Sequence, residues 1–441
     1  MKRDLSVRLN FKVLWALLVA PGILPGTAAE ALPPSNPKAL TLEEAIRVAL
    51  ENNPSLRASA AEVDAASARE FQGRKWSNPE LELAAEEWPV EKGHGFSDAK
   101  RTIGVAQTVP FPGKKSLDRR IGSAGVKLSD AELVLRQTEL VRDVKVSFFS
   151  VLTAAQRLAV ADELLKVAES SAATARKRVE AGAAAYQEQL RAEILLEQVR
   201  VELSNDQRAL EVARQGLFTM LGRPEFRDVQ LAGTLSESTD TEEAGPPGRE
   251  AKEKMLRRHP SYRAAQANVD RARLETRRAR LQSYPDVKTG VAGGRLGDTD
   301  ESIIELRFSV PLPLFDTGKG KRREADAQLA RAEADLEAIR QQLQSELASA
   351  LGRCRAATAQ IAHYRQHMLP KAQEALRLVR TGFEDGKFGL IDLLDIQRTD
   401  AEARRAYLEK LFELNSAQAE LDSLLGATPD PKPLALPQST K

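Results

Sequence analysis

Apolar residues recur at helical spacing along most of this chain. Leucines follow one another at intervals of seven residues in two stretches: Leu196, Leu203, Leu210 and Leu217, and then Leu329, Leu336 and Leu343. A seven-residue repeat is typical of helices that pack as coiled coils. The pattern is unbroken from Gly113 to Ala181 and from Gly318 to Phe383, so each range predicts a helix on the order of 100 Å long.

The helical period stops at four short stretches in which apolar and polar residues alternate. These are LELAAEEW (81–88), RTIGVAQTV (101–109), VKTGVAGG (287–294) and SIIELRFSV (302–310). In the last stretch, Ile304, Leu306 and Phe308 fall on one side of an extended chain, and Glu305 and Arg307 fall on the other. Polar loops containing glycine join the stretches in pairs, so the pattern predicts two β-hairpins.

The chain is built twice. NPSLRASAAEVDAA, which begins at Asn53, is echoed by HPSYRAAQANVDRA, which begins at His259, 206 positions later. Gly182 in VEAGAAA and Gly386 in FEDGKFG are likewise 204 positions apart. A repeat of this length indicates a tandem duplication. Each half is therefore expected to hold a helix, a strand hairpin and a long helical hairpin that turns at its glycine.

The amino terminus predicts export. Basic residues precede an apolar run from Val13 to Ala20, and small residues follow. This order is typical of a secretory signal peptide cleaved after Ala29 or Ala31, and the run is too short to span a membrane. The expected organisation is a signal peptide (1–29), a first repeat (30–222), an equatorial linker (223–248), a second repeat (249–426) and a tail (427–441).

Composition and motifs exclude several classes of function. The formal net charge is only +2, which gives no basic field for nucleic acid. The single cysteine, Cys354, cannot form a disulfide within the chain and is expected in the core. The sequence contains no GxSxG, HExxH or CxxC motif, so we expect no catalysis and no cofactor.

One histidine pair has the spacing of metal ligands. His363 and His367 are four residues apart and could share an ion on one helical face. Such a pair more often lies on the surface without binding a metal, and no metal site is assigned.

Four exported amphipathic strands of this length fit an outer-membrane barrel. Lipid does not tolerate open strand edges, so several chains must share one barrel. Two chains would give eight strands and a filled interior, whereas three would give twelve and room for a passage. The expected fold is mainly α with a small membrane β part. The alternative is a soluble sheet domain. Trp88, Phe111 and Phe315 near the strand ends suit anchoring at the membrane interface, and core packing competes with that role.

The chain resembles the TolC-like outer-membrane efflux proteins over nearly all of its mature length. The residues that carry the resemblance are LTLEEAIRVALENNPSL, the duplicated hairpins, VPLPLFDTGKG and RTGFEDGKFGLIDLLDIQ. The resemblance implies a homotrimer in the outer membrane of a Gram-negative bacterium, with a twelve-stranded barrel and a periplasmic tunnel of helices. It also implies docking to a periplasmic adaptor protein and an inner-membrane pump of the RND type.

VPLPLFD is most similar to the CzcC-like heavy-metal branch, so heavy-metal cations are the expected cargo. A duct for drugs or type I protein secretion is the alternative within transport. An exported structural coiled coil that never inserts is the alternative outside it.

The resemblance also implies site residues. Asp392 and Asp395 match acidic residues that ring the inner end of the channel in the family, and ordinary helix capping is the competing interpretation. Phe383 and Phe388 stand where related gates have tyrosine and arginine, so we expect no such polar lock. The turns, where glycines and small residues allow close approach, are expected to contact the adaptor through Val179, Gly182, Ala183, Phe383, Gly386, Phe388, Gly389 and Leu390.

Overall fold

The computed structural model describes residues 39–87, 99–223, 229–237, 249–297, 299 and 301–426. The expected signal peptide, the tail, most of the linker and Trp88 lie outside these residues.

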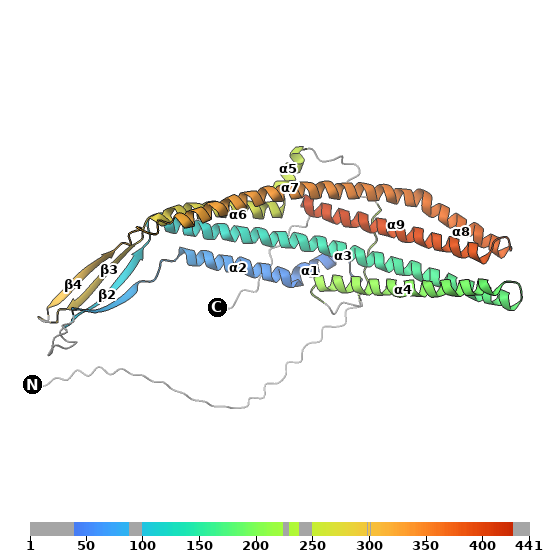
Figure 1. Ribbon diagram of the computed structural model, residues 1–441, viewed down its shortest axis with the longest axis horizontal. Helices are drawn as coiled ribbons and strands as arrows, with labels where there is room; N and C mark the ends of the chain where they lie inside the picture. The colour runs from blue at the N-terminus through green and yellow to red at the C-terminus, as the bar shows by residue number, and fades with distance from the viewer. Residues whose placement is uncertain are drawn as a thin grey trace, which may run out of the picture. The chain divides into compact units, whose positions relative to one another are not determined.

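Long helices and one sheet make up the described chain, and the same order of elements occurs twice (Figure 1). The first half contains α1 (Leu42–Asn52), α2 (Pro54–Arg74), β1 (Glu80–Glu86), β2 (Lys100–Val109), α3 (Lys114–Glu180) and α4 (Tyr186–Met220). The second half contains α5 (Arg249–Arg258), α6 (Pro260–Arg280), a 3₁₀ turn η3 (Leu281–Ser283), β3 (Val287–Arg295), β4 (Ser302–Ser309), α7 (Lys319–His363), a π-turn η4 (Tyr364–Met368), α8 (Leu369–Glu384) and α9 (Leu390–Leu425).

Proline divides the short helical arms at equivalent places. The residue before a proline is disfavoured in the helical conformation, so α1 ends before Pro54 and α5 ends before Pro260. Proline suits the first turn of the following helix. Asn53 caps α2 by accepting a bond from the Ser55 amide at 2.8 Å, and His259 Nδ1 accepts one from the Ser261 amide at 3.2 Å.

The long helix expected over 318–383 is not continuous. The matching helix of the first half, α3, runs unbroken, but here a π-turn separates α7 from α8. Pro370 provides the physical reason, because it has no amide hydrogen to donate to the Gln366 carbonyl and its ring clashes with that carbonyl. The widened turn accommodates the missing bond, and the helix then continues to Glu384.

The four strands form one antiparallel sheet in the order β1-β2-β3-β4. The two expected hairpins are therefore present, and β2 pairs with β3 to join the two halves of the chain. In this central pairing Ala106 lies opposite Gly290 and Val109 lies opposite Val287.

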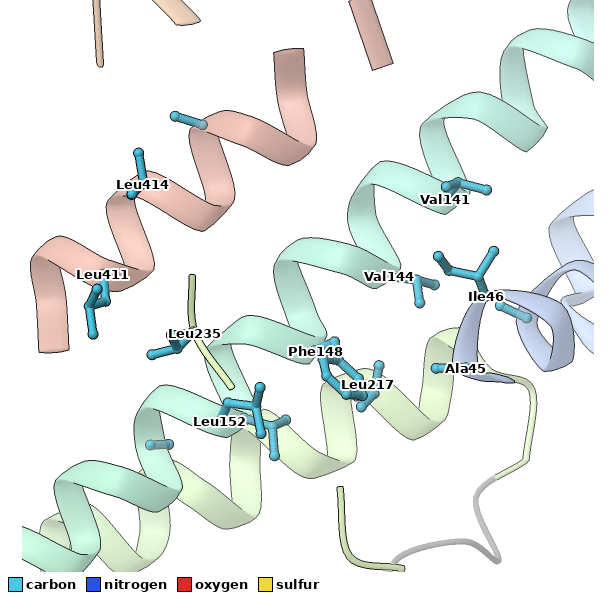
Figure 2. Close-up of a cluster of buried hydrophobic side chains, with 14 of the residues drawn as sticks. Ala45, Ile46, Val141, Val144, Phe148, Leu152, Leu217, Leu235, Leu411 and Leu414 are labelled. Atoms are coloured by element: carbon cyan, nitrogen blue, oxygen red, sulfur yellow. The ribbon is translucent and has the colours of Figure 1, made fainter. Parts of the chain in front are cut away.

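The main core surrounds the middle of α3, which packs against α1, α4 and α9. Figure 2 shows Phe148 of α3 beside Leu217 of α4 and Val144 of α3 beside Ile46 of α1. Leu411 and Leu414 of α9 belong to the same buried cluster. Burying a side chain of this size stabilises the fold by roughly 1.5–3 kcal/mol. The described part of the linker, residues 229–237, contributes Leu235 to this cluster. Cys354 is buried in it, as expected.

Candidate functional site: the sheet and the helical tips

One face of the sheet is apolar and exposed. Ile304 is 82% exposed and Phe308 is 72% exposed. Leu81, Leu83, Ile103, Val105, Val291 and Leu306 are also exposed and occupy the same face by alternation. A contiguous apolar surface of this kind marks contact with a membrane or another protein. Among the described residues, the outer edges of β1 and β4 pair with no further strand.

The opposite face of the sheet carries a network of charges. Lys288 lies 2.7 Å from both Glu80 and Glu82. Arg307 continues the network, at 3.2 Å from Glu82 and 2.9 Å from Glu305. The network crosses the sheet from β1 to β4 and satisfies charged groups that would be costly in lipid. An apolar face outside and a polar face inside is the arrangement of strands in outer-membrane barrels.

The aromatic residues near the strand ends have different environments. Phe111 stacks on Tyr284 with ring centroids 4.6 Å apart, which corresponds to packing between the two halves. Beside it, the buried Lys114 donates to the Tyr284 carbonyl at 2.7 Å and to Asp286 Oδ1 at 2.8 Å. Phe315 is fully exposed and remains a candidate for anchoring at the interface.

Gly182 and Gly386 form the two helical turns. Their φ angles, +68° and +74°, lie in the left-handed region that side chains disfavour. After the first glycine, the Ala183 amide donates to the Arg178 carbonyl at 2.8 Å, and this bond closes the end of α3. A Cβ atom on either glycine would meet nothing within 4 Å. Backbone conformation is therefore the first reason for glycine here, and the space beside both turns is open.

The structure places most of the expected docking residues on the surface of the two turns. Gly182, Ala183, Gly386, Phe388 and Gly389 are exposed, while Val179 and Phe383 are half-buried. Leu390 is the exception, because it is only 2% exposed. It packs with Ala172, Ala175, Ala192 and Leu394 and so joins one helical hairpin to the other.

Asp392 and Asp395 are both exposed on α9, whereas Leu393 and Leu394 between them are buried. Asp392 Oδ2 accepts a bond from the Gly389 amide at 2.9 Å, so helix capping accounts for this residue. Asp395 has no part in that bond, and its carboxylate is exposed one helical turn beyond Asp392.

Two neighbouring arginines link the helical hairpins and were missed from the sequence. Arg404 of α9 lies 2.9 Å from Glu163 of α3, and Arg405 lies 2.8 Å from Glu202 of α4. Arg404 also pairs with Asp400, whose pKa is raised by burial. The partners are more than 200 residues apart in sequence, so no local pattern could have paired them. Adjacent arginines in an otherwise amphipathic helix were the available signal.

Comparison with known proteins agrees with this geometry. The model of the family "Outer membrane efflux protein" matches residues 45–223 and 252–427. The cobalt-zinc-cadmium resistance protein CzcC of Cupriavidus metallidurans is 30% identical over 88% of this chain and 90% of its own length. The pyoverdine export outer membrane protein OpmQ of Pseudomonas aeruginosa is 25% identical over 87% and 85%.

Solved structures agree on the fold. The open-state outer membrane channel MtrE of Neisseria gonorrhoeae superposes with a TM-score of 0.73 at 22% identity, covering 87% of this chain and 88% of that one. The chain therefore belongs to the outer membrane efflux protein family.

Proposed function

We propose that three copies of this chain form an outer-membrane exit duct for heavy-metal cations. The two-faced sheet with its unpaired edges carries the proposal. An apolar outer face fits lipid, and the edges of β1 and β4 must pair before the sheet can lie in a bilayer. Three sheets give the twelve strands needed for an open passage. The duct has no catalytic role, and a partner pump supplies the energy.

The relatives support the choice of cargo. A protein named for cobalt, zinc and cadmium resistance matches nearly the full chain at 30% identity, whereas the pyoverdine exporter matches at 25%. Export of larger molecules is the alternative function, because the same architecture serves it.

The two helical turns are the proposed docking surface for a periplasmic adaptor that belongs to an RND-type pump. Gly182, Ala183, Gly386, Phe388 and Gly389 are exposed there and leave room for a partner's helices. Asp392 and Asp395 lie just beyond the second turn. In a trimer they present six carboxylates, which we propose to form a cation-binding ring at the narrow inner end.

Membrane insertion can be tested with two matched substitutions in β4. Leu306 lies on the apolar face and Ile303 on the charged face. Leu306→Arg should prevent accumulation in the outer membrane, because arginine on the lipid face of a barrel costs about 2–4 kcal/mol at mid-membrane. Ile303→Arg should still insert. Membrane fractionation with detection of heat-resistant trimers is the measurement. Equal insertion of both variants, or a detergent-free soluble oligomer, would refute the barrel.

Cargo is tested in cells that lack this gene but keep the partner adaptor and pump. Returning the gene should lower cell-associated cobalt, zinc or cadmium and raise the concentration that stops growth. Restored drug or siderophore export without any effect on metals would reject the proposed cargo and favour the alternative function.

A further inference from the structure

Two of the four histidines of the chain lie at one widened turn of the second helical hairpin, one directly before it and one within it. His363 ends α7, and His367 lies within the π-turn that leads to α8. Pro370 explains why the turn is widened but not why it carries two imidazoles. The equivalent stretch of the first half, around Ala159 and Glu163, contains no histidine. The pair is therefore not required by the packing of a helical hairpin.

The two imidazole rings already have the separation of shared metal ligands. Their centroids lie 5.2 Å apart, with an angle of 62° between the ring planes. Zinc–nitrogen bonds of about 2.0–2.1 Å in a tetrahedral site place the centres of two coordinating rings about 5 Å apart. Rotation about the side-chain torsions is sufficient to direct a nitrogen of each ring at one ion.

The surroundings leave the pair accessible. Both histidines are exposed, so neither fills a core. Within the described residues neither ring has a hydrogen bond or an ion pair, and each ring contacts the other edge to face. Arg365 lies between them in sequence, but its guanidinium is 2.6 Å from Glu237. That ion pair offsets the positive charge that lies between the two histidines in the sequence.

We propose that His363 and His367 bind one divalent transition-metal ion. Neutral imidazole suits nickel, cobalt, zinc and copper, and copper binds tightest in the usual order of affinities. No group of three or more His, Cys, Asp or Glu side chains occurs among the described residues, so water completes the coordination. A site with two protein ligands releases its ion readily. The ion also stabilises the π-turn, since it joins His363, directly before the turn, to His367 within it. This site does not require the duct to carry metals.

The test uses full-length trimers in detergent, purified without a histidine tag and titrated with nickel ions alone by calorimetry. Wild type should bind one ion per chain at this site. His367→Asn and His363→Asn should each weaken that binding by at least the ~10- to 100-fold that loss of a second-shell partner typically costs. Gln366→Asn, a change in the same exposed turn, should bind as wild type does.

Two further readouts separate loss of the site from loss of the fold. The metal-free variants should melt at the temperature of metal-free wild type, and saturating nickel should raise the melting temperature of wild type by more than that of the variants. A double variant that binds nickel as tightly as wild type would overturn the proposal, because the ion would then bind elsewhere. Absence of binding to wild type would overturn it too. Either result leaves the outer-membrane duct unaffected.

Discussion

At the scale of single residues, the two halves of the chain carry different side chains at the same capping position, where the second of the short helices (α2 or α6) begins. In the first half, Asn53 Nδ2 donates to the Met220 carbonyl at 2.8 Å and closes the joint between α2 and α4. In the second half, His259 takes the same helix-capping position beside a cavity of about 990 Å³ between α3, α6, α7 and α9. Burial lowers the pKa of His259, while Glu346 and Glu139 partly oppose the shift.

This difference predicts a pH effect at the second joint. The folded chain binds fewer protons at His259 than the unfolded chain, so stability is lost as pH falls below the unfolded pKa of about 6.5. Protonation also removes the Nδ1 acceptor for the Ser261 amide. His259→Asn should remove this dependence, worth up to about 1.4 kcal/mol per pH unit. Melting temperatures between pH 8 and 5 are the measurement. Asn53→His should introduce a similar slope, and identical pH profiles of all three proteins would contradict the argument.

The aspartates near the second turn call for substitutions that separate charge from capping. Asp392→Asn with Asp395→Asn removes six negative charges from a trimer but keeps an oxygen to accept the Gly389 amide bond. In planar bilayers this variant should need about tenfold more divalent cation for half-block, because the carboxylates no longer attract it. Asp392→Ala should in addition destabilise the start of α9, by on the order of 1 kcal/mol. Unchanged block and selectivity in the double asparagine variant would leave capping as the whole role of Asp392.

At the scale of elements, some residues of the two helical turns are needed for the backbone conformation, and others can serve as a contact surface. Any side chain at Gly182 or Gly386 strains a left-handed backbone, so loss of function there would not identify a docking site. Ala183 is exposed and free of this constraint. Ala183→Glu should abolish efflux while trimers remain intact. Ala173→Glu, at an exposed position about three helical turns away on α3, is the matched control and should be silent. Normal efflux by the Ala183 variant would remove the first turn from the docking surface.

The spacing of apolar residues predicted the helices and strands well, because it depends directly on which side chains are buried. The strands of the second half were expected at 287–294 and 302–310 and occur at Val287–Arg295 and Ser302–Ser309. The break at Pro370 was missed, because the residues of the π-turn are not buried and therefore leave no mark on the pattern of apolar positions. The candidate site was predicted less completely. Alternation indicated the charged face of the sheet, but pairs such as Arg405 with Glu202 depend on how two hairpins pack.

At the scale of the whole molecule, the internal duplication predicts how copies pair. The β2–β3 seam joins the halves with Val109 opposite Val287. Val310 matches Val109 and Leu81 matches Val287 in the repeated sequence. If β4 of one copy meets β1 of the next as β2 meets β3, Val310 lies opposite Leu81, and Phe308 opposite Leu83.

Cysteine cross-linking measures this register. Opposed strand residues have Cα atoms about 4.5–5.5 Å apart, within the range that a disulfide spans. Phe308→Cys with Leu83→Cys, in a Cys354→Ala background, should oxidise to covalent trimers on denaturing gels. Ile304→Cys with Leu81→Cys is out of register and should remain monomeric. Trimers from the second pair alone would refute the proposed seam.

The unpaired edges of β1 and β4 have a genetic consequence. A chain alone would expose backbone groups to lipid at several kcal/mol each, so a barrel forms only when every seam in the ring closes. One copy with a defective edge therefore prevents two normal copies from completing a barrel. With equal amounts of normal and defective chains mixing at random, only about one trimer in eight is wholly normal. A mutant allele that folds but cannot pair its edge should therefore be dominant negative, whereas an allele that makes no protein should be recessive.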